Sequence, residues 1–445
     1  MAELGDLCRT AVEAAQDGEG IEAYAEESRR TEVGARKRQI EGLTFAESRG
    51  VGVRLVSGAR LGYAYAADPS EDEVRATVVR ARENAALAGE DPNHVLPEPA
   101  FVDPMPELFR KEQAAMPTDA KVALALDLER LTTTTDPRVT KVDECQVGDA
   151  VSRMAIANSN GLAAEYARTD TWCLAVTLAE EGGETQTGFS YRIGRELGDL
   201  EWEAIATEAV ERAVAMLGAK KPPTARVPVV LDPFAGMSFL GVLAGALSAE
   251  AVQKGRSLFA DKVAEVVASP AITLVDDGRL LDGPGACPFD DEGVPSRRTE
   301  LISGGTLRGF LHNSYTAKRG GTTSTGNAQR AGYRSTPGVG TTNFYLEAGA
   351  KSVPELMLEA EDGVLIQEVS GVHSGANPIS GEFSVGATGL RIRGGAGAEG
   401  LREMTIASTI PDMLKAVSAV GSDLRFFSSV GVPSILIGEM TVAGV

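Results

Sequence analysis

Histidine is scarce in this chain: only His94, His312 and His373 occur in 445 residues. No two of them stand at the spacing of an HExxH-like or HxH-like metal motif. A GxSxG serine elbow is also missing from the sequence. A composite metal site built from His312, His373 and Cys287 stays open, because residues far apart in a sequence can meet in a fold.

Cysteine is equally sparse. Cys8, Cys145, Cys173 and Cys287 lie far apart and form no CxxC pair. That spacing argues against a disulfide framework and favours free thiols in a reducing compartment. The opening residues MAELGDLCRTAVEAAQ carry acids where a signal peptide carries basic residues, and they predict an amphipathic helix. We therefore expect a cytoplasmic protein.

Long hydrophobic runs and excess positive charge are lacking as well. The stretch MSFLGVLAGALSAEAV, residues 237 to 252, is among the most apolar, yet it falls short of the about 20 apolar positions that cross a bilayer. We expect a packing helix there and no membrane contact. The net charge of −20 argues against nucleic acid as a partner, because phosphate binding requires a concentrated positive surface.

The chain is long enough for several domains, and its pattern predicts an α+β protein. Strand, turn, strand and helix occur twice, each time after a leading helix, in residues 1–118 and 119–222. The six prolines between residues 91 and 118 predict a connector, in which His94 should be exposed. These two similar α/β units are expected to form an antiparallel sheet with helices on one face.

Residues 223–445 predict a third domain of mostly short strands and glycine turns, like a barrel, with a few helices. The glycine-rich run from 316 to 330 lacks the order of a phosphate-binding loop and is predicted to be a mobile basic loop. Asp276 with Asp277, and Asp290 to Glu292, precede glycines and predict hairpin turns. They are weak candidates for acid–base chemistry or magnesium binding.

The segment GVHSGANPISGEFSVGATG, residues 371 to 389, is the densest unusual feature. Its glycines allow close backbone approach beside a sheet, which suits the capture of an extended peptide, and ordinary turn formation explains it equally well. The candidate peptide-binding residues are Gly371, His373, Ser374, Asn377, Ser380, Gly381 and Phe383.

Several motifs in one order give the chain a resemblance to the TldD and PmbA (TldE) family of peptidase-related proteins. They are SRGVGVRLVSGARLGYAYAAD, VVLDPFAG, FDDEGVPSRRTELISGGTLRGFLHNSYTAKR, STGN and GEFSVGATG. The resemblance spans nearly the whole chain. It implies an N-terminal α+β region followed by a barrel-like C-terminal region.

In the TldD branch, the resemblance implies a helix with HExxxH that binds zinc, and a cysteine ligand late in the chain. These positions fall on Leu240, Gly241, Gly245 and Pro433, none of which can ligate or act as a base. The chain is therefore similar to the PmbA (TldE) branch. We expect no catalytic residue and no metal on this chain, and we expect Leu240, Gly241 and Gly245 to close the site by packing.

The resemblance implies a non-catalytic subunit of a heterodimer, with zinc on a TldD-type partner and an extended peptide as substrate. Such a complex trims unfolded peptides, including leader peptides of modified natural products. One alternative is an independent enzyme with zinc-free chemistry that uses His312, Tyr315, His373 and the cluster Asp290 to Glu292. Another is a homodimeric module that binds peptides without cleaving them.

Overall fold

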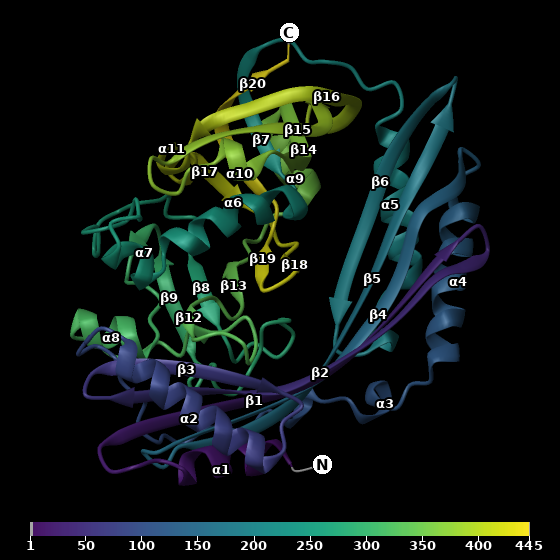
Figure 1. Ribbon diagram of the computed structural model, residues 1–445. Helices are drawn as coiled ribbons and strands as arrows, with labels where there is room; N and C mark the ends of the chain where they lie inside the picture. The colour runs from purple at the N-terminus through teal and green to yellow at the C-terminus, as the bar shows by residue number, and fades with distance from the viewer. Residues whose placement is uncertain (1–2, 445) are drawn as a thin grey trace.

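The N-terminal half of the computed structural model is built on one six-stranded antiparallel sheet (Figure 1). The structure describes residues 3–444, so Met1, Ala2 and Val445 lie outside the described residues. The strands are β1 (Glu19–Arg36), β2 (Gln39–Ser57), β3 (Arg60–Ala67), β4 (Val139–Asn158), β5 (Ala163–Glu181) and β6 (Glu184–Gly194). Their order β3-β2-β1-β4-β5-β6 joins the two predicted units into a single sheet.

The long helices of this half cover one face of the sheet, as predicted. They are α1 (Leu4–Glu13), α2 (Glu71–Leu87), α4 (Thr118–Thr135) and α5 (Trp202–Ala215). In β1, Ile21 and Ala23 pack in the core formed with α1 and α2, whereas Val33 packs with residues of α4 and α5. Because alternate residues of a strand share one face, these odd-numbered positions place both helix pairs on the same side.

The order helix, three strands, helix occurs twice along the chain, which confirms the predicted pair of similar units. In both units the strands are joined by tight hairpins, with turns at Ser57–Gly58 and at Glu181–Gly183. The connector between the units contains only the short helices η1 (Pro106–Leu108) and α3 (Lys111–Ala114). Its His94 is half-buried against the ring of Tyr315, at a centroid distance of 5.4 Å, so the prediction of an exposed histidine was wrong.

The C-terminal half contains a closed five-stranded barrel. Its strands are β7 (Ala225–Leu231), β14 (Gly363–Ser370), β15 (Glu382–Arg393), β16 (Ala396–Thr409) and β20 (Ile435–Ala443). The pairing of β16 with β20 closes the ring. Two further elements lie against it, α11 (Ile410–Ala416) and β17 (Val417–Val420). The barrel-like prediction is confirmed.

A second sheet lies beside the barrel and faces the N-terminal half (Figure 1). Its strands are β10 (Thr306–Leu307), β9 (Arg298–Ser303), β8 (Leu274–Asp277), β13 (Phe344–Leu346), β19 (Val430–Val432) and β18 (Arg425–Phe426), with the small ladder β11 (Ala328–Gln329) and β12 (Gly338–Val339) nearby. Besides α11, the helices of this half are α6 (Pro233–Ala246), α7 (Ala249–Gln253), α8 (Ser314–Gly320), α9 (Val353–Ala360) and α10 (Val372–Gly375).

Helix α8 occupies the start of the run that was predicted to be a mobile loop. Asn313 caps the helix, because its Oδ1 accepts a hydrogen bond from the amide of Thr316 at 2.9 Å, and Gly321 ends it in the left-handed conformation. The sequence prediction missed this cap, since glycines dominate the segment.

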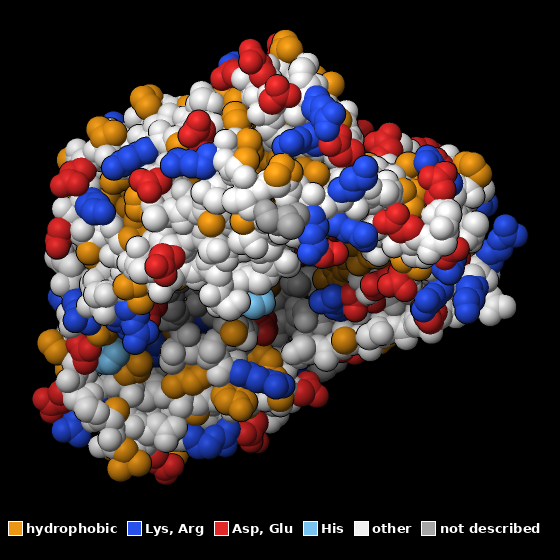
Figure 2. All heavy atoms as spheres, turned by 90° about the horizontal axis from the view of Figure 1, so that it is seen from above, with side chains coloured by type: hydrophobic (Ala, Val, Ile, Leu, Met, Phe, Trp, Pro, Cys, Tyr) orange, Lys and Arg blue, Asp and Glu red, His pale blue; other side chains and the backbone are white. Residues whose placement is uncertain are grey.

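No helix among residues 3–444 is long and apolar enough to cross a membrane. On the face shown in Figure 2, acidic and basic side chains are interspersed, so no broad basic surface forms there.

Candidate functional site

Helix α6 holds three of the four positions at which the sequence differs from a metal-binding motif. Its start is fixed by Asp232, whose Oδ1 accepts a hydrogen bond from the amide of Ala235 at 2.8 Å, and by Pro233 in the first turn. One side of the helix, including Phe239 and Leu243, is buried in the main core of the C-terminal half. The apolar stretch is therefore a packing helix up to Ala246, as predicted, but Ser248 caps a separate helix, α7, that holds the rest.

Leu240 and the two glycines lie on different sides of α6. Leu240 is 1% exposed and packs in the core, whereas Gly241 and Gly245 are exposed. A Cβ atom added to either glycine would meet no other atom within 4 Å. The expectation that all three residues close the site by packing is therefore wrong for the glycines, which leave open space along one side of the helix.

The fourth position, Pro433, lies in a segment that packs against the first turn of α6. A Cβ atom on Gly236 would lie 3.0 Å from Cγ2 of Val432, the residue before Pro433. Pro433 itself is buried and carries no ligating atom. The fold thus brings this segment and α6 together, although they are about two hundred residues apart in the chain.

The amino-terminal end of α6 is fastened to the N-terminal half by charges and aromatic rings. Arg212 of α5 lies 2.6 Å from Asp232 Oδ2, and Arg425 of β18 lies 2.8 Å from Glu208 Oε1 of α5. Phe234 in the first turn contacts the rings of Phe189 and Phe427, at centroid distances of 4.4 and 5.3 Å. These contacts hold α6 in a fixed position relative to the sheet.

Burial raises the pKa of both carboxylates at this junction, and the neighbouring arginines lower it. The net shift is upward for Asp232 and downward for Glu208. Burial raises the pKa of Asp232 above its ordinary value, and the nearby Arg212 offsets only part of the effect. Burial would also raise the pKa of Glu208, but the hydrogen bond from Arg425 and the charges of Arg425, Arg192 and Arg212 lower it to about 2. Glu208 is thus a fully ionised anchor at neutral pH.

The candidate peptide-binding segment is a surface loop whose polar groups serve local turns. Its residues Gly371, His373, Ser374, Asn377 and Ser380 are exposed, while Gly381 and Phe383 are buried. Asn377 Oδ1 accepts hydrogen bonds from the amides of Ile379 and Ser380 at 2.8 and 3.1 Å, and Ser374 Oγ donates to the carbonyl of Gly371 at 3.1 Å. These bonds support the turn-forming interpretation.

Phe383 is misplaced among the candidate residues for peptide binding. Its side chain is 1% exposed and packs edge-on against Phe239 of α6, with ring centroids 5.9 Å apart. The residue therefore contributes to the core, and the alternation of β15 turns it away from the surface.

The residues of the alternative enzyme do not converge on one site. In the described part of the chain, no hydrogen bond or ring contact joins His312, His373 or Cys287 to one another, and no group of three His, Cys, Asp or Glu side chains could hold a metal ion. Tyr315 donates a hydrogen bond to Asp91 Oδ2 at 2.8 Å, in the connector. Burial lowers the pKa of His312.

The acids from Asp290 to Glu292 are saturated by structural contacts. The Asp290 carboxylate accepts hydrogen bonds from the amides of Glu292, Val294 and Ala328 at 2.9, 3.0 and 2.9 Å. Burial raises the pKa of Asp290 well above its ordinary value and that of Asp291 to about 6. The predicted turn is confirmed, and these contacts speak against a catalytic role.

The junction at Glu208, Arg212, Asp232 and Arg425 was not found from the sequence. The order Asp232-Pro233 after a strand is a typical helix start and could have signalled the cap. Nothing local to Glu208 or Arg425 could have indicated that they meet.

Comparisons with known proteins show which family the chain belongs to. Family descriptions match along the chain: PmbA/TldA metallopeptidase domain 1 at residues 21–85, the central domain at 111–217 and the C-terminal domain at 224–444. The chain belongs to the PmbA/TldD metallopeptidase family.

Individual relatives of both branches of the PmbA/TldD family resemble the chain over most of its length. Metalloprotease PmbA of Escherichia coli O157:H7 is 26% identical over 99% of this chain and 96% of its own. A Metalloprotease TldD homolog of Haemophilus influenzae is 28% identical over 90% of this chain and 88% of its own. The crystal structure of TldE from Thermococcus kodakarensis superimposes with a TM-score of 0.91 at 25% identity and covers 100% of both chains.

The metal implied by the PmbA/TldD family does not fit the residues found here. Zinc requires about three protein donors. Leu240 lies in the core, Gly241 and Gly245 offer no side chain, and Pro433 has no donor atom. The chemistry of a bound zinc ion therefore cannot be assigned to this part of the chain.

Proposed function

We propose that this chain is the metal-free, non-catalytic subunit of a heterodimeric peptidase of the TldD–TldE type. The observation that carries the proposal is the surface of α6, where Gly241 and Gly245 leave open space and Leu240 is turned into the core. If another subunit holds the zinc ion of the peptidase, this chain needs no metal-ligating side chains at these positions. Zinc is then expected on a TldD-type partner.

The role of this subunit would be to complete the enclosure around the partner's cleavage site and to admit extended peptides. The substrates in this proposal are unfolded or extended peptides, including leader peptides of natural products. The open side of α6 supports the proposal, since it offers room for a neighbouring chain without a clash. Four free cysteines, three of them buried, suit a reducing compartment, and we propose the cytoplasm.

The test compares the chain expressed alone with the chain coexpressed with a TldD-type partner. Zinc content is measured by atomic emission, and cleavage is measured on an unstructured peptide and on the same sequence within a folded domain. We expect no stoichiometric zinc and no cleavage in the lone chain, and both in a one-to-one complex that spares the folded substrate. Zinc-dependent cleavage by the lone chain would overturn the proposal, and so would a stable homodimer that ignores the partner.

A further inference from the structure

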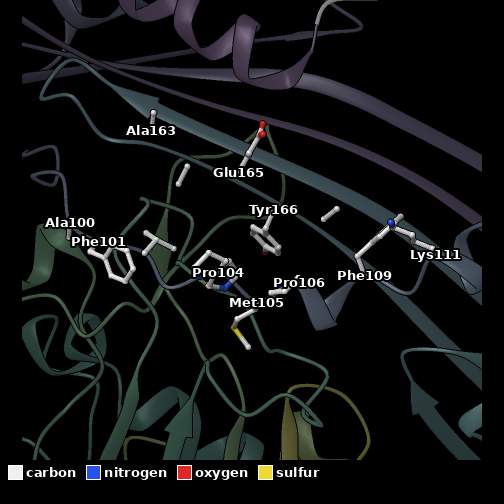
Figure 3. Close-up of a pocket in the computed structure, with 14 residues that line it drawn as sticks. Ala100, Phe101, Pro104, Met105, Pro106, Phe109, Lys111, Ala163, Glu165 and Tyr166 are labelled. Carbon is white, nitrogen blue, oxygen red and sulfur yellow. The ribbon is translucent and has the colours of Figure 1, made fainter.

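A pocket of about 600 Å³ lies between β5 and the Pro-rich connector (Figure 3). This volume falls in the range of ligand sites in proteins. The connector lines it with Phe101, Val102, Met105 and Phe109, and Tyr166 lies opposite them. None of its lining residues belongs to α6 or to the loop from 371 to 383.

The β5 wall of this pocket is the edge of the strand. Five consecutive residues, Ala163 to Ala167, line the pocket. Successive side chains of a strand point to opposite faces, so all five can border one space only where the strand's edge faces it. Figure 3 shows Glu165 and Tyr166 pointing apart from this edge. β6 pairs with β5 only from Thr171 onward, so among the described residues this edge has no partner strand.

The backbone groups that face the pocket follow from the ladder between β4 and β5. The amide of Asn158 donates to the carbonyl of Leu162 at 2.9 Å at the hairpin end. Antiparallel ladders alternate between residues bonded to the partner and residues turned away from it. The N–H and C=O groups of Ala163, Glu165 and Ala167 are therefore directed to the free edge, in the spacing that another strand requires.

We propose that this groove binds an extended, uncharged peptide segment of another molecule, which adds as a strand to the free edge of β5. Main-chain pairing would supply affinity, and an apolar side chain would enter the space between Tyr166 and the connector. Lys111 and Glu165 are the two charged residues of the lining, and they carry opposite charges. Glu165 Oε2 points toward the first turn of α1, where an added Cβ on Gly5 would lie 3.4 Å away.

The chain has a second unpaired strand edge, on β2, which differs from the β5 edge in having no wall opposite it. β3 pairs with β2 only from Gly50 to Ser57, so the edge of β2 from residue 39 to residue 48 is also unpaired among the described residues. That stretch is fully exposed, with Leu43 and Phe45 at 55% and 63%, and it has no second wall. Of these two edges, that of β5 combines free backbone groups with an apolar wall opposite them.

The test uses the full chain and a fluorescein-labelled, capped heptapeptide of alternating threonine and leucine. Binding is measured by fluorescence anisotropy for the wild type, Glu165→Pro and Glu165→Ala. Proline removes an amide that faces the groove while the ladder to β4 stays intact, and alanine keeps that amide. We expect Glu165→Ala to bind as the wild type does and Glu165→Pro to bind about tenfold more weakly. Phe101→Ser, at a side chain that is 84% exposed, should also weaken binding.

A second measurement does not depend on the folding of any variant. The same heptapeptide with N-methyl groups on all of its amides cannot donate hydrogen bonds to β5 from either edge, and it should not bind. Equal affinity for the two peptides, or for Glu165→Pro and Glu165→Ala, would overturn the proposal, as would absence of binding to the wild type. Concentration-dependent dimers that Glu165→Pro abolishes would also overturn it, because the occupant would be a second copy. The lone chain suffices, so failure here is distinct from failure of the heterodimer.

Discussion

The guanidinium of Arg54 on β2 lies 2.7 Å from Glu292 Oε1, although 238 residues separate them in the chain. The same guanidinium lies 2.6 Å from Glu22 Oε2 on β1, and Arg330 pairs with the other oxygen of Glu22. All four side chains are buried. Two positive and two negative groups thus balance inside the contact between the N-terminal sheet and the C-terminal half.

Breaking this network should destabilise the protein. Glu292→Gln leaves Arg54 and Arg330 with one carboxylate, and the loss of one partner of a buried ion pair costs about 3–5 kcal/mol. We expect the urea midpoint to fall accordingly. Glu73→Gln is the matched control, because its pair with Arg80 is exposed and should change the free energy of unfolding by less than about 1 kcal/mol. Equal effects of both variants would contradict this account.

The glycines on the open side of α6 should be replaceable by alanine with a gain in stability. Gly241→Ala and Gly245→Ala each add a Cβ that meets no atom within 4 Å, and alanine is favoured over glycine in a helix by about 1 kcal/mol. Thermal unfolding of the lone chain should shift upward. Gly236→Ala is the control, because its Cβ would lie 3.0 Å from Val432 and should cancel the gain.

The ion pairs of Glu208 should make stability depend on pH in the acidic range. The folded pKa of Glu208 is lowered to about 2 from its ordinary value of 4.5, so its contribution is fully present above pH 4.5 and is lost as pH falls toward 2. The shift corresponds to roughly 3 kcal/mol. We expect Glu208→Gln to lower the melting temperature at pH 7 and to approach the wild type as pH falls to about 2. A difference that grows on acidification would exclude this role.

The N-terminal elements could be predicted because their signals are local. Turn residues such as Gly58, Gly161 and Gly182 separate alternating strands, and each signal lies within a few residues of the element it ends. The sequence could not show that β1 and β4 pair at the centre of one sheet, since this pairing joins residues more than a hundred positions apart. The boundaries after residues 118 and 222 stay predictions for separately folding units.

The candidate site could be predicted only in part, because the sequence places residues on a helix but does not show which of them face the core. Family likeness located Leu240, Gly241 and Gly245 on a helix, but it could not tell which of them face the core. That distinction depends on the rotation of α6 against the barrel, which long-range packing determines. Phe383 was misassigned because a glycine-rich segment conceals the start of β15, where side chains alternate between core and surface.

Restoring the motif should not restore a peptidase. The triple variant Leu240→His, Gly241→Glu and Gly245→His would restore only the two histidines and the glutamate of the motif. The first histidine would lie where Leu240 is 1% exposed in the core, and the second would face open space. Pro433 supplies no further ligand, and a zinc site also needs hydrogen-bond partners that orient its histidine rings, which the triple variant does not add. We expect substoichiometric zinc by atomic emission and no cleavage of an unstructured peptide. Gly245→His alone serves as the control for weak surface binding of zinc, and efficient zinc-dependent cleavage by the triple variant would show that this helix is still competent for catalysis.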